Sequence, residues 1–175
     1  MKGYTIWFTG LSGSGKTTIA NKLADILRKR GKSLVVLDGD IVRKTLSADL
    51  GYTKGERDKH ITRIVHACEL ITKNHVINIA CVISPTRHIR KYAKDLIGKD
   101  NFIEVYVKCP LEVCEKRDVK GHYAKVRSGE IEHFVGINVP YEEPLNPDLV
   151  LETDKESVTE SANKLIDEMV SRKII

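Results

Sequence analysis

The sequence predicts an α/β fold in which a parallel β-sheet of about five strands carries helices on both faces. Five short apolar segments are continuously hydrophobic rather than alternating with polar residues, which is typical of strands buried on both faces. Segments with helical periodicity separate these strands along the chain, and that alternation indicates parallel pairing. The length of 175 residues suits a single domain over 1–175 that can bury a core.

The first predicted strand is Tyr4–Thr9, whose aromatic and β-branched residues favour extended structure. A glycine-rich segment follows it. From Lys16 onward, apolar residues recur at three- and four-residue spacing, which predicts a helix that ends in basic residues and stops at Gly31. The second strand, Ser33–Leu37, runs into two aspartates separated by one glycine.

The rest of the chain repeats this alternation. Apolar runs predict three further strands, and amphipathic stretches predict four further helices. The expected strands are Val76–Val82, Phe102–Val107 and Leu149–Leu151. The expected helices are 55–74, Arg87–Ile97, Leu111–Arg117 and Ser157–Arg172.

One long segment, 118–147, is rich in glycine, proline and charge and has little periodicity. A stretch of this length inside a compact domain is usually a binding loop or a lid. We therefore expect a mobile lid at about 118–136.

Composition narrows the class of protein. The net charge of +5 suits an anionic small molecule as well as nucleic acid. Basic residues are interleaved with acidic ones, so no nucleic-acid partner is expected. No apolar run is long enough for a membrane span, the start of the chain has no signal-peptide pattern, and the four cysteines form no C-x-x-C pair. These features predict a cytoplasmic protein with reduced core thiols.

A phosphate-binding motif occupies residues 10–17, which read GLSGSGKT and match G-x-x-x-x-G-K-[ST]. A predicted strand precedes the motif and a predicted helix follows it. Glycines let backbone N–H groups surround phosphate oxygens, Lys16 reaches the β- and γ-phosphates, and the Thr17 hydroxyl ligates Mg²⁺. The motif predicts binding of a nucleoside triphosphate with Mg²⁺ as cofactor, through Gly10, Ser12, Gly13, Ser14, Gly15, Lys16, Thr17 and Thr18.

The acceptor of the phosphate is the second question. The chain has no N-K-x-D motif after a strand, so a GTPase is disfavoured, and its length best fits a small-molecule kinase. Asp38 and Asp40 follow the second strand, at the edge where such sheets bind ligands. We expect Asp40 to orient and deprotonate the acceptor hydroxyl, or to hold Mg²⁺ through water. Either aspartate could instead be only a helix N-cap.

Nine segments of the chain together carry a resemblance to a known family. They read GLSGSGKTT, LDGD-IVR, LSADLGY, ERDKHITR, ISPTR, PLEVCEKRD, VKG-HY, GEIEHFVGI and PYEEPLNPDLVLET. In this order they resemble the adenylylsulfate (APS) kinase family over about residues 4–153. The resemblance implies a P-loop kinase that transfers the γ-phosphate of MgATP to the 3′-hydroxyl of APS, giving PAPS. It also implies a homodimer whose partners are small-molecule nucleotides.

The resemblance assigns roles to individual residues. Asp40 and Lys16 would be catalytic, and Arg117 would contact the ATP adenine. Tyr52 and Phe134 would sandwich the substrate base. The expected substrate-binding set is Asp38, Arg43, Tyr52, Arg57, His60, Ile83, Ser84, Lys120 and Phe134, and Ser84 is phosphorylatable in some relatives.

Departures from the family pattern lie on the substrate side. His60 and Thr62 stand where the family often has Asn and Arg, and Thr86 where it usually has a larger residue. The lid reads KGHYAKV instead of the usual KGLYKKA, and HFVGI replaces NFTGI. These changes keep open an APS-kinase-like enzyme acting on cytidine diphosphoramidate in capsule biosynthesis. A non-catalytic nucleotide-binding module is a further alternative.

Overall fold

The computed structural model describes residues 2–175 and contains a five-stranded sheet in which every neighbouring pair is parallel. The strand order is β2-β3-β1-β4-β5. The strands are β1 (Tyr4–Thr9), β2 (Leu34–Asp38), β3 (Ile77–Cys81), β4 (Phe102–Lys108) and β5 (Leu149–Glu152). The α/β fold class predicted from the sequence is confirmed.

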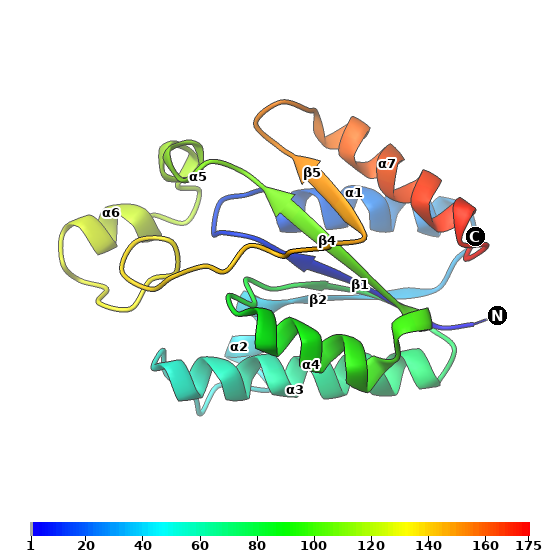
Figure 1. Cartoon of the computed structure of the whole chain (residues 1–175), viewed down its shortest axis with the longest axis horizontal. Helices are drawn as coiled ribbons and strands as arrows, with labels where there is room; N and C mark the ends of the chain where they lie inside the picture. The colour runs from blue at the N-terminus through cyan, green and yellow to red at the C-terminus, as the bar shows by residue number, and fades with distance from the viewer. Residues whose placement is uncertain (1) are drawn as a thin grey trace.

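Helices cover both faces of this sheet (Figure 1). Those connected with the strands are α1 (Lys16–Lys29), α3 (Lys54–Lys73), α4 (Arg87–Ile97) and α7 (Val158–Ser171). Helices α1 and α7 pack together on one face, and α3 and α4 pack together on the other. Shorter helical segments are α2 (Gly39–Lys44), α5 (Leu111–Arg117), α6 (His122–Arg127) and the 3₁₀ turn η1 (Lys99–Asn101).

The central strand explains why the sheet is buried on both sides. Ile6 and Phe8 of β1 point into the core beside α1, whereas Trp7 points into the core beside α3 and α4. All three side chains are fully buried, because successive residues of a strand face opposite sides of the sheet. A continuous apolar run is therefore what this position requires.

The described residues contain two helices that the sequence pattern did not predict. Helix α2 has six residues, too few to display a period, and begins because the Asp38 carboxylate accepts hydrogen bonds from its first backbone N–H groups. Helix α6 lies inside the predicted lid and begins where the Asp118 carboxylate accepts from the N–H groups of Tyr123 and Ala124. The bounds of β1, α4 and α5 are those predicted, and the remaining boundaries differ from the predicted ones by at most two residues.

The cysteines and three of the histidines differ in burial. All four cysteines are free and buried, as expected of core thiols. His66, His75 and His88 are exposed. Among residues 2–175, no helix has both the length and the apolar character that crossing a bilayer requires.

The parallel arrangement brings the carboxyl ends of all five strands to one edge of the sheet. Helices α5 and α6 and the irregular segment after them extend beyond this edge, at the left of Figure 1. The phosphate motif, both aspartates and the corner after β3 all follow strand ends, so they converge at this edge.

Candidate active site

The phosphate loop connects β1 with α1, and two of its glycines are required by close backbone packing. Gly10 has φ +149°, and a Cβ there would lie 2.4 Å from the carbonyl oxygen of Val107. Gly13 has φ +74°, and a Cβ there would lie 2.9 Å from the carbonyl oxygen of Cys114. A side chain at either position would force the loop away from β4 and α5, so only glycine permits this path.

Lys16 is buried at the start of α1, and its ammonium group turns back into the loop. It donates hydrogen bonds to the carbonyl oxygens of Gly10, at 2.9 Å, and Leu11, at 2.6 Å. Burial lowers the pKa of Lys16 to about 8, since the charged form loses its hydration. Anionic phosphate oxygens are better partners for this ammonium than neutral carbonyls, so the loop is suited to a polyphosphate.

Thr17 and Asp38 join the phosphate loop to the end of β2. The Thr17 hydroxyl donates a 2.6 Å hydrogen bond to Asp38 Oδ2, and Asp38 Oδ1 accepts from the N–H of Asp40 at 2.9 Å. Asp38 is 8% exposed and lines the hollow of the phosphate loop. Both Asp38 oxygens are thus directed to Thr17 and to the start of α2, and Asp38 lies apart from the pocket that the other predicted substrate-binding residues line.

The hydroxyl and carboxylate oxygens of Thr17 and Asp38 fit a Mg²⁺ ion. This ion prefers oxygen ligands and in kinases is usually held by one or two protein groups together with phosphate oxygens and water. A P-loop hydroxyl beside an aspartate at a strand end is the pair that holds Mg²⁺ in P-loop enzymes generally. Asp40, the next carboxylate along the chain, lines the same hollow.

The hollow over the phosphate loop has a volume of about 600 Å³, within the usual range for small-molecule sites. Arg117, at the end of α5, lines it and donates a 2.6 Å hydrogen bond to the carbonyl oxygen of Thr153. Thr18 lines the hollow as predicted. Gly10 and Ser14 of the loop are buried and do not line it. Nine further residues line this hollow that the sequence did not predict for the site: Ile19, Ile41, Asp118, Val119, Tyr123, Thr153, Glu156, Val158 and Ser161.

A second, smaller hollow of about 150 Å³ lies on the other side of Asp40. Seven of the nine residues predicted to bind substrate line this hollow: Arg43, Tyr52, Arg57, His60, Ile83, Ser84 and Phe134. His122, His133 and Val135 of the lid segment also line it, in addition to the predicted substrate-binding set. We call this hollow the acceptor pocket.

Two arginines border the acceptor pocket, and each is anchored by a backbone carbonyl. Arg43 donates a 2.7 Å hydrogen bond to the carbonyl oxygen of Gly51, and its guanidinium lies 4.7 Å from the centre of the Tyr52 ring. Arg57 donates to the carbonyl oxygen of His133 at 3.1 Å, which links α3 to the lid segment. Two cations held in place at one pocket favour an anionic ligand.

The two predicted base-stacking aromatics differ in exposure. Tyr52 is 64% exposed, whereas Phe134 is 9% exposed and packs edge-on against Tyr123, with ring centres 4.9 Å apart. Both line the acceptor pocket, so the structure brings them to the same space as predicted. Phe134 is held rigidly, and Tyr52 is the ring with freedom to adjust to a ligand.

His60 of α3 lies at the inner end of the acceptor pocket and is 5% exposed. Burial, together with the charge of Arg43, lowers the pKa of His60 to about 4, so the ring is neutral near pH 7. Its Nδ1 atom has no hydrogen-bond partner among the described residues. A buried unpaired nitrogen is costly unless a ligand or water pairs with it, which marks His60 as a contact for a bound molecule.

Asp40 lines both hollows, as do Lys16, Ser12 and Ile83. Burial alone would raise the pKa of Asp40, but the hydrogen bond and charge of Lys120, with His122 and Lys16, hold this pKa below its usual value. Lys120 comes from the lid segment, forms an ion pair with Asp40 and lines the phosphate-loop hollow only. Lys120 was predicted to bind substrate, and the structure places its side chain against Asp40 instead of among the residues that line the acceptor pocket.

Known proteins similar to this chain show which family it belongs to. A family model described as adenylylsulphate kinase matches residues 2–152. The chain belongs to the adenylylsulphate kinase family. A relative named adenylyl-sulfate kinase, from Halothermothrix orenii, is 55% identical over 166 residues, which cover 95% of this chain and 89% of that protein.

Solved structures of the adenylylsulphate kinase family agree with this assignment. The Mycobacterium tuberculosis APS kinase in complex with AMPPNP and APS has a TM-score of 0.91 and 43% identity, covering 96% of this chain and 98% of that chain. A hexameric APS kinase from Thiobacillus denitrificans has a TM-score of 0.74 and 31% identity, covering 97% of this chain and 29% of that one.

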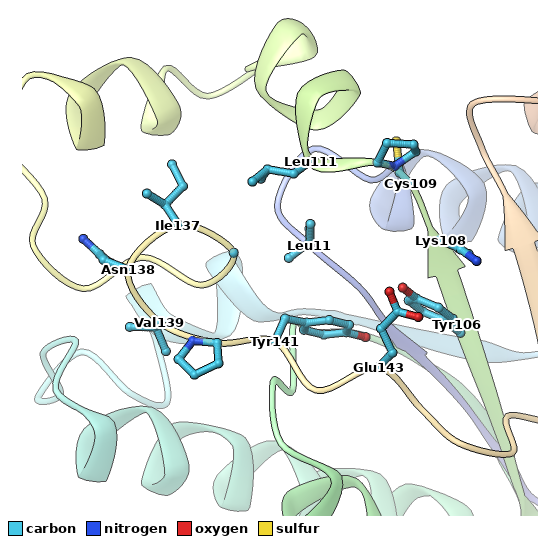
Figure 2. A pocket seen from close by; sticks show the side chains of 13 residues that line it. Leu11, Tyr106, Lys108, Cys109, Leu111, Ile137, Asn138, Val139, Tyr141 and Glu143 are labelled. Atoms are coloured by element: carbon cyan, nitrogen blue, oxygen red, sulfur yellow. The ribbon is translucent and has the colours of Figure 1, made fainter.

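A third hollow, of about 510 Å³, lies beyond Leu11 on the far side of the phosphate loop and contains none of the predicted site residues. Figure 2 shows Leu11, Leu111 and Ile137 around its apolar part, and Tyr141 and Glu143 beside β4. In this family member the hollow separates the segment after the lid from the end of β4.

Proposed function

We propose that this kinase transfers the γ-phosphate of MgATP to the 3′-hydroxyl of adenosine 5′-phosphosulfate, giving PAPS. The observation that carries the proposal is the position of Asp40 and Lys16 where the phosphate-loop hollow meets the acceptor pocket. A donor phosphate on one side and a hydroxyl on the other would meet at these two residues.

On the donor side, the triphosphate would lie along the phosphate loop at the N-terminus of α1, which favours negative charge. Lys16 would exchange its two carbonyl partners for β- and γ-phosphate oxygens. Thr17 and Asp38 would hold Mg²⁺, which neutralises charge on the transferring group when bound. Arg117 and Val158, which line the outer part of the same hollow, would border the adenine.

On the acceptor side, the anionic 5′ group of the nucleotide would meet Arg43 and Arg57, and its base would lie between Tyr52 and Phe134. Aromatic rings on both faces suit a planar base. The acceptor pocket of about 150 Å³ is smaller than a nucleotide requires. Binding would therefore displace part of the lid segment, including the contact of Arg57 with His133 and that of Lys120 with Asp40.

In the transfer step, Asp40 would accept the proton of the 3′-hydroxyl as the 3′ oxygen bonds to the γ-phosphorus. The bond from this phosphorus to the β–γ bridging oxygen breaks, and ADP leaves. The ordinary pKa of an aspartate, about 3.9, lies well below 7, so the Asp40 carboxylate would be ionised near neutral pH, as this role needs, even after Lys120 has moved away. The closed lid would exclude water, which otherwise competes as acceptor.

A direct test follows ADP formation from MgATP with and without APS, and locates the new phosphate by ³¹P NMR. We expect APS-dependent turnover and a 3′-phosphorylated product. The variant Asp40→Asn should bind both nucleotides but lose transfer by about 10²–10⁴-fold. The control Asp49→Asn changes a carboxylate in an exposed ion pair with Arg63 and should keep activity. Full transfer by Asp40→Asn would remove Asp40 from its role.

A second candidate acceptor is cytidine diphosphoramidate. It is favoured by His122 and His133, two imidazoles that line the acceptor pocket at positions where the lid departs from the usual family pattern. A phosphoramidate carries N–H donors, and an imidazole nitrogen can accept from them. The family members named above favour APS, and a comparison of the two acceptors decides between them.

We further propose that the chain forms a homodimer, as the family resemblance implies, and works in the cytoplasm, as its cysteine pattern predicts. Light scattering during gel filtration tests the assembly, and a mass near twice 19.7 kDa is the expected result. A monomer, or a larger assembly such as a hexamer, would contradict it.

A further inference from the structure

The corner that follows β3 forms one wall of the acceptor pocket and carries unusual backbone geometry. Ile83, Ser84 and Pro85 all line the pocket. Ser84 has φ 39°, a left-handed conformation that residues with a side chain rarely adopt. A residue before proline also prefers extended structure, so Ser84 is unfavourable on two counts. Such a conformation persists only when the surrounding contacts fix it.

Buried hydroxyl groups supply the first of these contacts. The Ser84 side chain is fully buried, and its Oγ accepts from the indole N–H of Trp7 at 3.1 Å and donates to Thr9 Oγ1 at 2.9 Å. The Thr9 hydroxyl donates to the carbonyl oxygen of Ile83 at 2.7 Å and lies 2.9 Å from the hydroxyl of Tyr141. The corner is thus tied to the central strand β1.

A buried arginine supplies the second set of contacts. Arg90 of α4 donates to the carbonyl oxygen of Ser84 at 2.6 Å and to that of Glu142 at 2.5 Å, and it pairs with Glu104 of β4 at 3.0 Å. The N–H of Glu142 donates to the carbonyl oxygen of Pro85 at 2.8 Å. The corner is therefore held between the sheet and the segment that follows the lid, in which Tyr141 lies beside β4 (Figure 2).

We propose that Ser84 is a positioning residue for the acceptor nucleotide, whose buried hydroxyl holds this corner in its left-handed conformation and so preforms one wall of the acceptor pocket. The inference rests on the proposed function, because it needs an acceptor that binds in this pocket. A buried Oγ with both hydrogen bonds made is not available as a phosphate acceptor. Ser84 acts through the backbone shape that its side chain maintains.

Two substitutions of Ser84 distinguish an effect on the backbone conformation from a direct role of the hydroxyl group. Ser84→Ala removes the hydroxyl but keeps the steric penalty of a Cβ at positive φ, whereas Ser84→Gly removes both. We expect Ser84→Ala to raise the acceptor KM and the Kd for APS, measured by calorimetry, by roughly five- to thirty-fold, the cost of one or two hydrogen bonds. The kcat and the KM for ATP should stay within about twofold, since the transition-state contacts are unchanged.

Ser84→Gly should recover most of the lost acceptor affinity, since glycine adopts positive φ without strain. Equal losses in the two variants, or none in either, would overturn the proposal, because a hydroxyl that is phosphorylated or touches the ligand is missing from both.

A matched pair on β1 controls for lost stability. Thr9→Val removes the hydroxyl that joins Ser84 to Ile83 and should reproduce the rise in acceptor KM. Thr5→Val removes an equally buried hydroxyl from the opposite end of the same strand, where it contacts Thr72 and Asn78, and should leave the acceptor KM unchanged. Equal effects of the two valine variants would assign the change to general destabilisation and contradict the proposal.

Crystal structures of the two Ser84 variants give a readout that does not depend on activity. We expect position 84 to keep its positive φ in Ser84→Gly and to relax in Ser84→Ala, displacing Ile83. An unchanged corner in Ser84→Ala would overturn the inference even in an active enzyme. By contrast, wild-type protein that neither binds nor phosphorylates APS would contradict the proposed function and leave the corner to be judged from these structures.

Discussion

The hydroxyl of Thr17 donates a 2.6 Å hydrogen bond to the carboxylate of Asp38, and this bond connects the phosphate loop to the end of β2. Asp38 also caps α2 through the N–H of Asp40. One buried aspartate thus fixes the relative positions of Thr17, the proposed metal ligand, and Asp40, the proposed catalytic carboxylate. Small movements at β2 would change both donor binding and proton transfer.

Replacing Thr17 by valine should weaken Mg²⁺-dependent activity, because it removes one oxygen ligand and leaves Asp38 Oδ2 without its donor. We expect Thr17→Val to lose about 10–100-fold in kcat/KM, comparable to losses at metal sites elsewhere. Thr17→Ser keeps the hydroxyl and should stay close to wild type. Titrating activity with Mg²⁺ checks this, and equal behaviour of the two variants would contradict a ligand role for the hydroxyl.

Nucleotide binding should take up protons at alkaline pH. Burial lowers the pKa of Lys16 to about 8, so part of the free enzyme has a neutral amine at pH 8.5. Phosphate charges favour the ammonium form and will raise this pKa, so binding captures a proton. Calorimetry in buffers of different ionisation enthalpy should detect uptake at pH 8.5 and much less at pH 6.5. Lys16→Arg, whose guanidinium stays charged, should abolish the difference, and its persistence there would contradict the assignment.

Stability should fall with acidity through His60. Burial lowers the pKa of His60 to about 4 in the folded protein, against about 6.5 for an ordinary histidine. The unfolded chain therefore binds a proton more readily, and the free energy of unfolding decreases as pH falls from about 6.5 towards 4. The contribution is on the order of 2–3 kcal/mol. Urea unfolding at several pH values should show a shallower decrease for His60→Asn, and identical profiles would contradict this cause.

Removing the lid lysine should shift the acid limb of the rate profile. Lys120 helps to hold the pKa of Asp40 below its usual value, so Lys120→Gln should raise that pKa and move the fall in kcat/KM to higher pH. Lys125→Gln changes another exposed lysine of the lid segment and serves as the control. An unchanged acid limb in Lys120→Gln would show that this ion pair does not govern Asp40.

The sheet could be predicted from the sequence because its strands are short, apolar and buried on both faces. Helix α2 could not be predicted, because its start depends on the Asp38 carboxylate and its six residues make fewer than two helical turns. Helix α6 begins at His122, within a segment that has no apolar period, and its first turn donates hydrogen bonds to the Asp118 carboxylate. Both depend on single capping contacts that only the folded backbone brings together.

The candidate site could be predicted where residues follow strands or belong to the phosphate motif. Thr153 was missed, although it directly follows β5 and so reaches the same sheet edge. The directions of the Asp38 and Lys120 side chains could not be predicted, because each side chain lies close to two adjoining hollows and could point into either. That choice depends on Thr17 and Asp40, which only the tertiary structure places beside them.

The central claim is that the acceptor pocket is built for APS. The most direct measurement compares kcat/KM for APS and for cytidine diphosphoramidate at the same MgATP concentration, with ³¹P NMR to identify each product. We expect kcat/KM for APS to exceed that for cytidine diphosphoramidate by at least about 10²-fold, the discrimination that a few charged contacts can supply. A faster reaction with the cytidine compound would contradict it, and would make His122 and His133 the residues that set specificity.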